Sequence, residues 1–403
     1  MLKQALITLL TAGIFVSGSG ATPALANTPT PAGELSDPTL CKIEQHPENL
    51  WTTRSGFPQH PDYSITSSKL NVQLIYVDAS DLKSNVSPSR DARFWINGVG
   101  KFLNDMAEGR VTFNFNFVNK YFRLPKPITT YGITREKQGD TAAFVQAAID
   151  AADKEVDFTN VDFVIVILPP NVSAKQVDYS PAIPLEKAFP FRTDEGLVYR
   201  ATLAGQDTRW PEGHTLISHE MGHLLGLQDF YWYGWKTGMP YEQQFKFMGH
   251  FDNMNFAPGK AREWVAWNRW LLGFLSDDQV RCVTSQATTV HELTTVSTRS
   301  KNPKLVVIPI DKYSAIVIES RRKARYDNQT LTRNNGALVY RIDTRKQSGF
   351  GPIEILRNKA SRDPYFADAT LTRGETLTIG NITIKNLRVS RSSDLVQVTL
   401  KQN

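Results

Sequence analysis

Two histidines one helical turn apart, with a glutamate beside the first, form the stretch of this chain best suited to chemistry. The sequence His219-Glu220-Met221-Gly222-His223 places both imidazoles on one face of a helix, because residues four apart lie one above the other. Zinc accepts His and carboxylate ligands, and a catalytic zinc keeps one position open for water. Glu220 then lies where it could take a proton from that water. The segment therefore predicts a metal centre with His219 and His223 as ligands and Glu220 as a base.

The residues after the second histidine favour a third ligand. Gly226 can end the helix in a left-handed conformation, and the chain can then turn back so that Asp229 reaches the ion. The simpler interpretation is that His219 and His223 are two ordinary helix histidines beside a solvated glutamate. That interpretation does not require Gly226 or Asp229 at these positions. A second alternative supplies the third ligand from a later helix, as Glu242 or Glu263. We expect Asp229 to be the third ligand.

The segments that must position this motif alternate between strand and helix patterns. Strand-like segments are 69–79, 111–122, 163–168 and 196–203, and helix-like segments are 92–107, 141–152 and 263–275. The run at 163–168 is apolar throughout, which is typical of a strand buried on both faces. Alternation of this kind predicts a mixed α/β (α+β) domain over residues 67–282, with a mixed sheet and an active-site helix. Residues 27–66, rich in Pro, Thr and Ser, predict an extended arm or a short pro-region.

The pattern changes at about residue 283, where short β-rich runs recur between turn-type clusters. These runs are 305–310, 315–320, 336–343, 375–379, 382–384 and 395–400. No helical pattern interrupts them, so residues 283–403 predict an all-β, sandwich-like C-terminal domain.

The first 26 residues predict secretion. Lys3 is followed by an apolar stretch at 5–16 and by Ala24-Leu25-Ala26, a small-x-small cleavage site. This is the pattern of a signal peptide, so the mature protein is expected to be extracellular. The apolar stretch is too short to span a bilayer, and no later run reaches the required length of about 20 residues. We therefore expect no membrane span.

The two cysteines of the chain, Cys41 and Cys282, both follow the expected cleavage site. In an oxidising compartment two cysteines most simply form one disulfide, which would tie the arm to the end of the α/β domain. The alternative is that the Cys41 thiolate binds the zinc as a latency plug in an uncleaved proform.

The formal charge of +6 on 403 residues hides an asymmetry. Residues 27–282 carry 25 basic and 30 acidic side chains, whereas residues 283–403 carry 20 basic and 10 acidic ones. A basic secreted module can favour anionic surfaces such as acidic glycans, and the simpler interpretation is a solvated basic face. No nucleic-acid-binding motif is present, so we expect no nucleic-acid partner.

The metal motif with aspartate as its last ligand resembles the metzincin signature, and neighbouring segments narrow the resemblance to the immune inhibitor A family of secreted metallopeptidases. Residues 225–231 (LGLQDFY) are similar to that family's L-G-L-P-D-x-Y segment, with Gln228 where proline is usual. Phe247-Met248-Gly249 resembles its methionine turn, and residues 258–274 resemble its helix ending in leucine-glycine-aromatic. Segments 318–321 and 336–340, with Asp327, are similar to the β-domain that follows the peptidase.

The motif and the resemblance together imply a zinc endopeptidase that acts on proteins or peptides, and we expect the secreted protein to be a monomer. Zn²⁺ would be its cofactor, and Ca²⁺ is not readable from the sequence. Met248 would form an apolar floor beneath the metal, and Tyr231 or Tyr233 would either support the oxyanion or pack beside the metal. We expect the strand at 196–203 to be the sheet edge on which an extended substrate pairs.

The rival interpretation is a secreted, non-enzymatic surface-binding protein with a structural zinc. A structural site is usually closed by four protein ligands, and His250 or Cys41 could supply the fourth. Glu220 argues against this interpretation, because a structural site has no use for a base.

Overall fold

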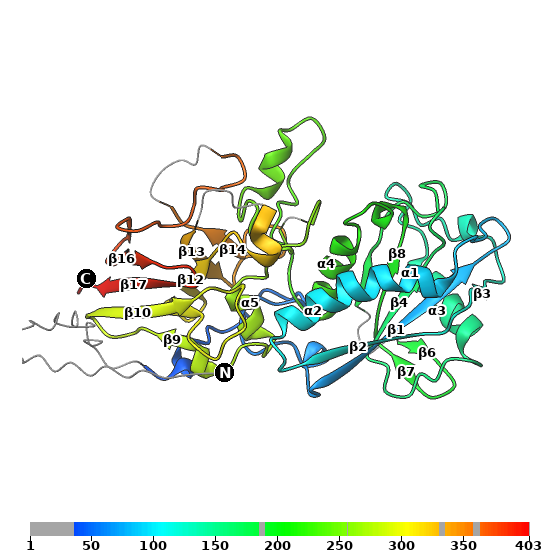
Figure 1. Ribbon diagram of the computed structural model, residues 1–403, viewed down its shortest axis with the longest axis horizontal. Coiled ribbons are helices and arrows are strands. Elements are labelled where there is room, and N and C mark those ends of the chain that lie inside the picture. The colour runs from blue at the N-terminus through cyan, green and yellow to red at the C-terminus, as the bar shows by residue number, and fades with distance from the viewer. Residues whose placement is uncertain (1–35, 185–189, 256, 330–334, 358–362, 403) are drawn as a thin grey trace, which may run out of the picture. The chain divides into compact units, whose positions relative to one another are not determined.

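The first half of the chain is built on a mixed β-sheet (Figure 1). The computed structural model describes residues 36–184, 190–255, 257–329, 335–357 and 363–402, so the expected signal peptide at 1–26 and the start of the arm lie outside it. The strand order is β2-β1-β4-β8-β5, with β3 paired to β1; β5 is antiparallel to β8 and the other pairs are parallel. The strands are β1 (Lys69–Asp78), β2 (Thr112–Phe117), β3 (Phe122–Arg123), β4 (Phe163–Ile167), β5 (Ala182–Pro184) and β8 (Arg200–Ala204), beside a separate pair, β6 (Phe191–Arg192) and β7 (Leu197–Val198).

Helices cover both faces of this sheet, which explains the unbroken apolar sequence of β4. Phe163, Ile165 and Ile167 pack in one core cluster with α1, α2 and α4, while Val164 and Val166 pack in a second cluster with α3. The helices are α1 (Pro88–Trp95), a π-helical turn (Ile96–Gly100), α2 (Lys101–Met106), α3 (Thr141–Ala152), α4 (His214–Leu224) and α5 (Ala266–Leu271). The expectation of a mixed α/β arrangement is therefore confirmed.

The expected helices differ from the observed ones mainly at their ends. The helix expected at 92–107 begins earlier, at Pro88, because proline fits the first turn of a helix. The helix expected at 263–275 is shortened to α5. At the start of α5, the N–H of Val265, the residue before the helix, donates to Asp252 at 2.7 Å, and the N–H of Ala266, its first residue, donates to Glu319 at 2.6 Å.

The strand expected at 196–203 does not form the edge of the sheet, so that prediction is wrong. Its second half is β8, which lies between β4 and β5. One edge of the described sheet is β5, a three-residue strand that is too short for an alternating pattern to reveal it; β2 lies at the other end of the strand order. The strand expected at 111–122 is also divided, into β2 and β3.

The region after residue 280 is rich in β-structure, as expected, and forms two sheets with the strand orders β14-β13-β12-β11-β9 and β10-β17-β16-β15. Side chains from both sheets share one core cluster, for example Ile316 and Val396. The strands are β9 (Val280–Cys282), β10 (Thr288–Thr294), β11 (Leu305–Asp311), β12 (Ser314–Arg321), β13 (Gly336–Asp343), β14 (Ile353–Ile355), β15 (Thr376–Ile379), β16 (Ile382–Val389) and β17 (Ser393–Leu400).

The β-rich region and the α/β region share buried contacts around α5. Glu319 on β12 accepts from the Ala266 N–H and from the Tyr340 hydroxyl, and one core cluster includes both Trp267 and Tyr340. Arg321, which is fully buried, pairs with Asp327 at 3.0 Å. Residue 282 therefore marks a change of secondary structure rather than a gap in packing.

The expected disulfide between Cys41 and Cys282 is confirmed. It excludes Cys41 as a thiolate ligand while the bond is intact. None of the helices in the described parts of the chain is both long and apolar enough to cross a membrane.

One buried histidine predicts a pH dependence of stability. His291 on β10 is 4% exposed, and burial, together with the charge of Arg281, lowers its pKa to about 4. Because an unfolded histidine titrates near pH 6.5, the unfolded state binds the proton first as the pH falls from about 6.5 to 4, and the fold loses stability across that window. We expect wild type to lose about 2 kcal/mol more than His291→Gln between pH 7 and pH 5, measured by urea unfolding. Parallel pH profiles for the two proteins would contradict this assignment.

Candidate metal centre

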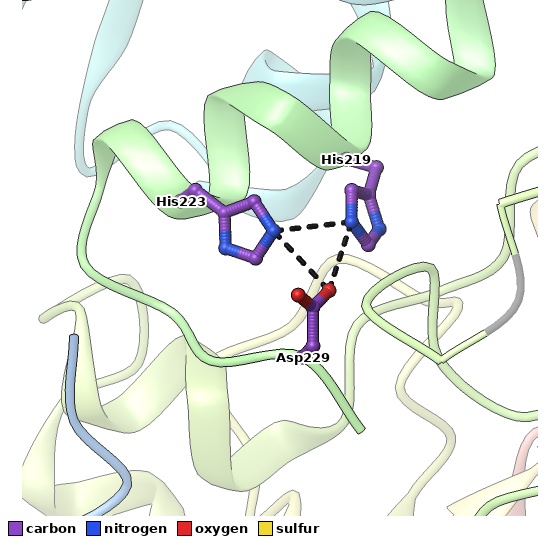
Figure 2. Close-up of side chains that lie close together, drawn as sticks. All are labelled: His219, His223 and Asp229. Carbon is purple, nitrogen blue, oxygen red and sulfur yellow. Dashed lines mark hydrogen bonds and ion pairs between the residues drawn. The ribbon is translucent and has the colours of Figure 1, made fainter. Parts of the chain in front are cut away.

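The predicted metal motif lies on α4 and on the turn that follows it (Figure 2). His219 and His223 extend from the same side of the helix, as their spacing of four requires. The helix ends at Leu224, and Gly226 follows with a φ of +92°, a conformation that favours glycine. The chain then reverses and brings Asp229 toward both imidazoles.

Three potential ligand atoms converge at this point. The Asp229 Oδ1 atom lies 3.0 Å from His219 Nε2 and 3.2 Å from His223 Nε2, and the two Nε2 atoms are 3.1 Å apart. Within the described part of the chain, these residues are identified as a group able to hold a metal ion. His219 and Asp229 are only 3% and 4% exposed, whereas 16% of the His223 side chain is exposed, so solvent reaches the group from the His223 side.

The outer nitrogens of the two imidazoles fix which tautomer each adopts. His219 Nδ1 lies 2.8 Å from the Asn253 carbonyl oxygen, and His223 Nδ1 lies 2.9 Å from the Leu227 carbonyl oxygen. A carbonyl only accepts, so each Nδ1 carries the proton and donates it, leaving the Nε2 lone pair of a neutral imidazole free. Backbone carbonyls commonly orient metal-binding histidines in this way. Two lone pairs and a carboxylate facing one another require a cation, either protons or a metal ion, and the donor set fits zinc.

The charges of the group are strongly coupled. Burial opposes protonation of His223, but the Asp229 carboxylate outweighs it and raises the pKa of His223 to about 9. Burial likewise opposes ionisation of Asp229, and the facing histidines nevertheless hold its pKa well below the usual range. The pocket thus stabilises positive charge between these side chains, which is the property that a cation site requires.

Glu220 lies next to the cluster and is held by the edge strand. Its Oε2 atom accepts a hydrogen bond from the Ala182 N–H of β5 at 2.7 Å. Burial raises the pKa of Glu220, and the positive charge of His219 and His223 opposes that rise. A carboxylate held in this position can accept a proton from a neighbouring group and return it. Sequence patterns gave no indication of Ala182.

The two expected tyrosines differ in their contacts. Tyr233 donates its hydroxyl to Asp229 Oδ2, so it orients the Asp229 carboxylate. The Tyr231 ring centroid lies 6.1 Å from that of His219, and burial together with Asp229 raises the pKa of Tyr231 well above 10. The Tyr231 hydroxyl therefore remains a proton donor.

A second methionine, absent from the sequence-based expectations, packs directly against the metal helix. Met248 is fully buried in the core cluster that includes the helix. Met254 lies closer to the motif: a Cβ atom on Gly222 would lie 2.4 Å from its Sδ atom. The neighbouring Asn253 supplies the carbonyl that orients His219.

The alternative ligands lie elsewhere. Glu263 is fully buried with Arg269 and Arg321 as charged neighbours, and burial raises its pKa to about 7. The His250 ring stacks on Tyr365 with a centroid separation of 4.3 Å. Neither residue, nor Glu242, belongs to the metal-binding group found in the described residues.

A cavity of about 390 Å³ opens beside His219 and Glu220. Leu216, Tyr231 and Phe245 supply apolar walls, and Arg135 and Asp207, paired at 2.7 Å, contribute opposite charges. The cavity is large enough to receive a side chain of a bound polypeptide.

Comparison of the chain with models of known protein families and with curated proteins finds no match.

The glycine after α4 provides a test of how the third ligand is placed. A Cβ atom at Gly226 would lie 2.5 Å from Gln59 Nε2 and 2.9 Å from Tyr63 Cγ. We expect Gly226→Ala to destabilise the fold by about 1–3 kcal/mol and to weaken metal binding, because the turn must shift. Gly238→Ala is the matched control: Gly238 also has a positive φ, +98°, but no atom lies within 4 Å of its added Cβ. Equal thermal stability and equal metal affinity of the two variants would refute the role of close packing.

Proposed function

We propose that this protein is a secreted zinc-dependent endopeptidase, related to the immune inhibitor A family. The observation that carries the proposal is the convergence of His219, His223 and Asp229 beside a glutamate that a backbone N–H orients. The motif resemblance supports it, and the disulfide and the absence of a membrane-spanning helix among the described residues are compatible with secretion.

In this proposal, His219, His223 and Asp229 hold the metal, and Glu220 moves the proton. Bound zinc would lower the pKa of water toward about 7 and polarise the substrate carbonyl. Glu220 accepts the proton of the attacking water and passes it to the nitrogen of the leaving amine. The Ala182 N–H keeps the Glu220 carboxylate in place during this exchange. Tyr231 donates its hydroxyl to the developing oxyanion, while Tyr233 holds Asp229.

Substrate would bind as an extended segment along β5, the edge strand of the sheet. The Ala182 N–H donates to Glu220 and Pro184 has no N–H, so the substrate backbone would pair with carbonyl groups of β5. Because the Ala182 N–H already donates to Glu220, this strand places the substrate beside the base. The cavity beside Glu220 would then take one substrate side chain.

The second candidate, a non-enzymatic surface-binding protein with a structural zinc, is less well supported. It needs a fourth protein ligand, and Cys41 forms a disulfide while His250 stacks on Tyr365. Because residues 283–403 carry excess positive charge, binding of this region to an anionic surface or glycan remains an additional prediction.

The test is to purify the mature chain, measure its bound zinc, and assay hydrolysis of casein or gelatin before and after removal of the metal with a chelator. Hydrolysis that disappears with the metal and returns with added zinc supports the proposal.

A further inference from the structure

The third ligand lies on a turn that is not part of any helix or strand. Two segments distant in sequence hold this turn, and the first is the N-terminal arm. The Arg54 N–H donates to the Gly226 carbonyl at 2.9 Å, and Gln59 Nε2 donates to the Leu225 carbonyl at 2.9 Å. Gln228, at the position where the family usually has proline, donates its side-chain Nε2 to the Thr53 carbonyl at 3.1 Å.

The second segment is the loop 344–352, which joins β13 to β14 in the β-rich region. The Asp229 N–H donates to Ser348 Oγ at 2.9 Å, and the Gly349 N–H donates to the Asp229 carbonyl at 2.9 Å. Both backbone polar groups of Asp229 are thus satisfied by this loop. The contact extends to Tyr233, whose N–H donates to the Gly349 carbonyl at 3.0 Å.

The side chains around this contact leave little freedom. Ser348 is 3% exposed and Asp229 is 4% exposed, so solvent reaches both residues poorly. Gly349 has a φ of +74°, and a Cβ atom there would lie 2.2 Å from the Tyr233 ring. The Tyr233 hydroxyl in turn contacts both Asp229 and Ser348 Oγ. Backbone and side chain of Asp229 are therefore fixed by one connected set of contacts.

We propose that Ser348 is a positioning residue of the metal centre, and that the β-rich region is required for metal binding as well as for any surface contact. A metal ligand must be held within about 0.5 Å of its binding position, and groups that orient ligands typically change metal affinity 10–100-fold when removed. Asp229 lacks the hydrogen bonds of a helix or strand, so the loop 344–352 supplies this restraint. The inference rests on the proposed metal centre but not on hydrolysis.

The test compares Ser348→Ala with Ser348→Thr, which keeps the hydroxyl. The control is Ser320→Ala, which removes another buried serine of the β-rich region, one that donates to Asp394 at 2.6 Å away from the metal ligands. Zinc affinity is measured by chelator competition, the visible spectrum of the Co²⁺-substituted protein reports ligand geometry, and thermal unfolding reports stability. We expect Ser348→Ala to bind zinc about 10–100-fold more weakly with an altered Co²⁺ spectrum. Ser348→Thr and Ser320→Ala should stay close to wild type in affinity.

Three results overturn the inference. If Ser348→Ala bound zinc as tightly as wild type, Ser348 would have no role in positioning Asp229. If Ser320→Ala lost as much zinc affinity as Ser348→Ala, the loss would reflect lower stability of the fold in general. If the wild-type protein bound no zinc, both this inference and the proposed function would be wrong. A wild type that binds zinc without hydrolysing protein would remove only the proposed function.

Discussion

Glu220→Gln should abolish most peptide hydrolysis while leaving zinc binding unchanged. The substitution keeps an oxygen that can accept the Ala182 N–H, so the local geometry is conserved. It removes the group that accepts the proton of the attacking water, and loss of a general base lowers rates by about 10²–10⁴-fold. The measurement is kcat/KM for casein or a derived peptide, with zinc content determined on the same samples.

Glu212→Gln serves as the control, because Glu212 precedes α4 and takes no part in the proposed chemistry. It should retain wild-type activity. Full activity in Glu220→Gln would show that Glu220 is not the base, whereas loss of zinc from this variant would assign it a binding role instead.

Asp229→Ala should weaken zinc affinity more than about 100-fold, since removing a ligand exceeds the usual effect of removing a group that orients one. The substitution leaves His219 and His223 facing each other without the carboxylate that lies 3.0 and 3.2 Å from their Nε2 atoms. Peptidase activity should fall with metal occupancy and recover in part at high zinc concentration. The affinity is measured by chelator competition at constant pH, because protons compete for the same nitrogens.

Glu242→Ala is the matched variant, since a glutamate from a later segment is the alternative third ligand. We expect its zinc affinity to equal that of wild type. Retention of zinc by Asp229→Ala together with its loss from Glu242→Ala would reverse the ligand assignment.

The convergence of His219, His223 and Asp229 was predictable because their spacing is local. Residues 219 and 223 share a helix face through helical periodicity alone, and Gly226 and Asp229 follow within six residues. The residues that hold these side chains and Glu220 were not predictable, because they come from distant parts of the chain. Ala182 lies on a three-residue edge strand, Asn253 on a loop, and Ser348 in the β-rich region. None of them belongs to a pattern that one sequence can reveal.

The difference between local patterns and contacts from distant segments also explains which parts of the fold were predicted correctly. Long periodic segments such as α3 and β4 were predicted almost to the residue, because their patterns are set by burial on defined faces. The sequence patterns did not indicate that β8 lies inside the sheet. Whether β8 is an edge strand or an interior strand depends on the short β5, which pairs with it from another part of the chain. The late start of α5 has a similar cause, since Asp252 and Glu319, from distant segments, accept the N–H groups of Val265 and Ala266.

The most direct measurement is the hydrolysis of casein by the mature wild-type chain carrying one equivalent of zinc, with Glu220→Gln at the same zinc content beside it. We expect wild type to release peptides and the variant to release on the order of 10²–10⁴-fold fewer per unit time. Zinc-loaded wild type that hydrolyses no protein or peptide substrate would contradict the proposed function and favour a binding protein.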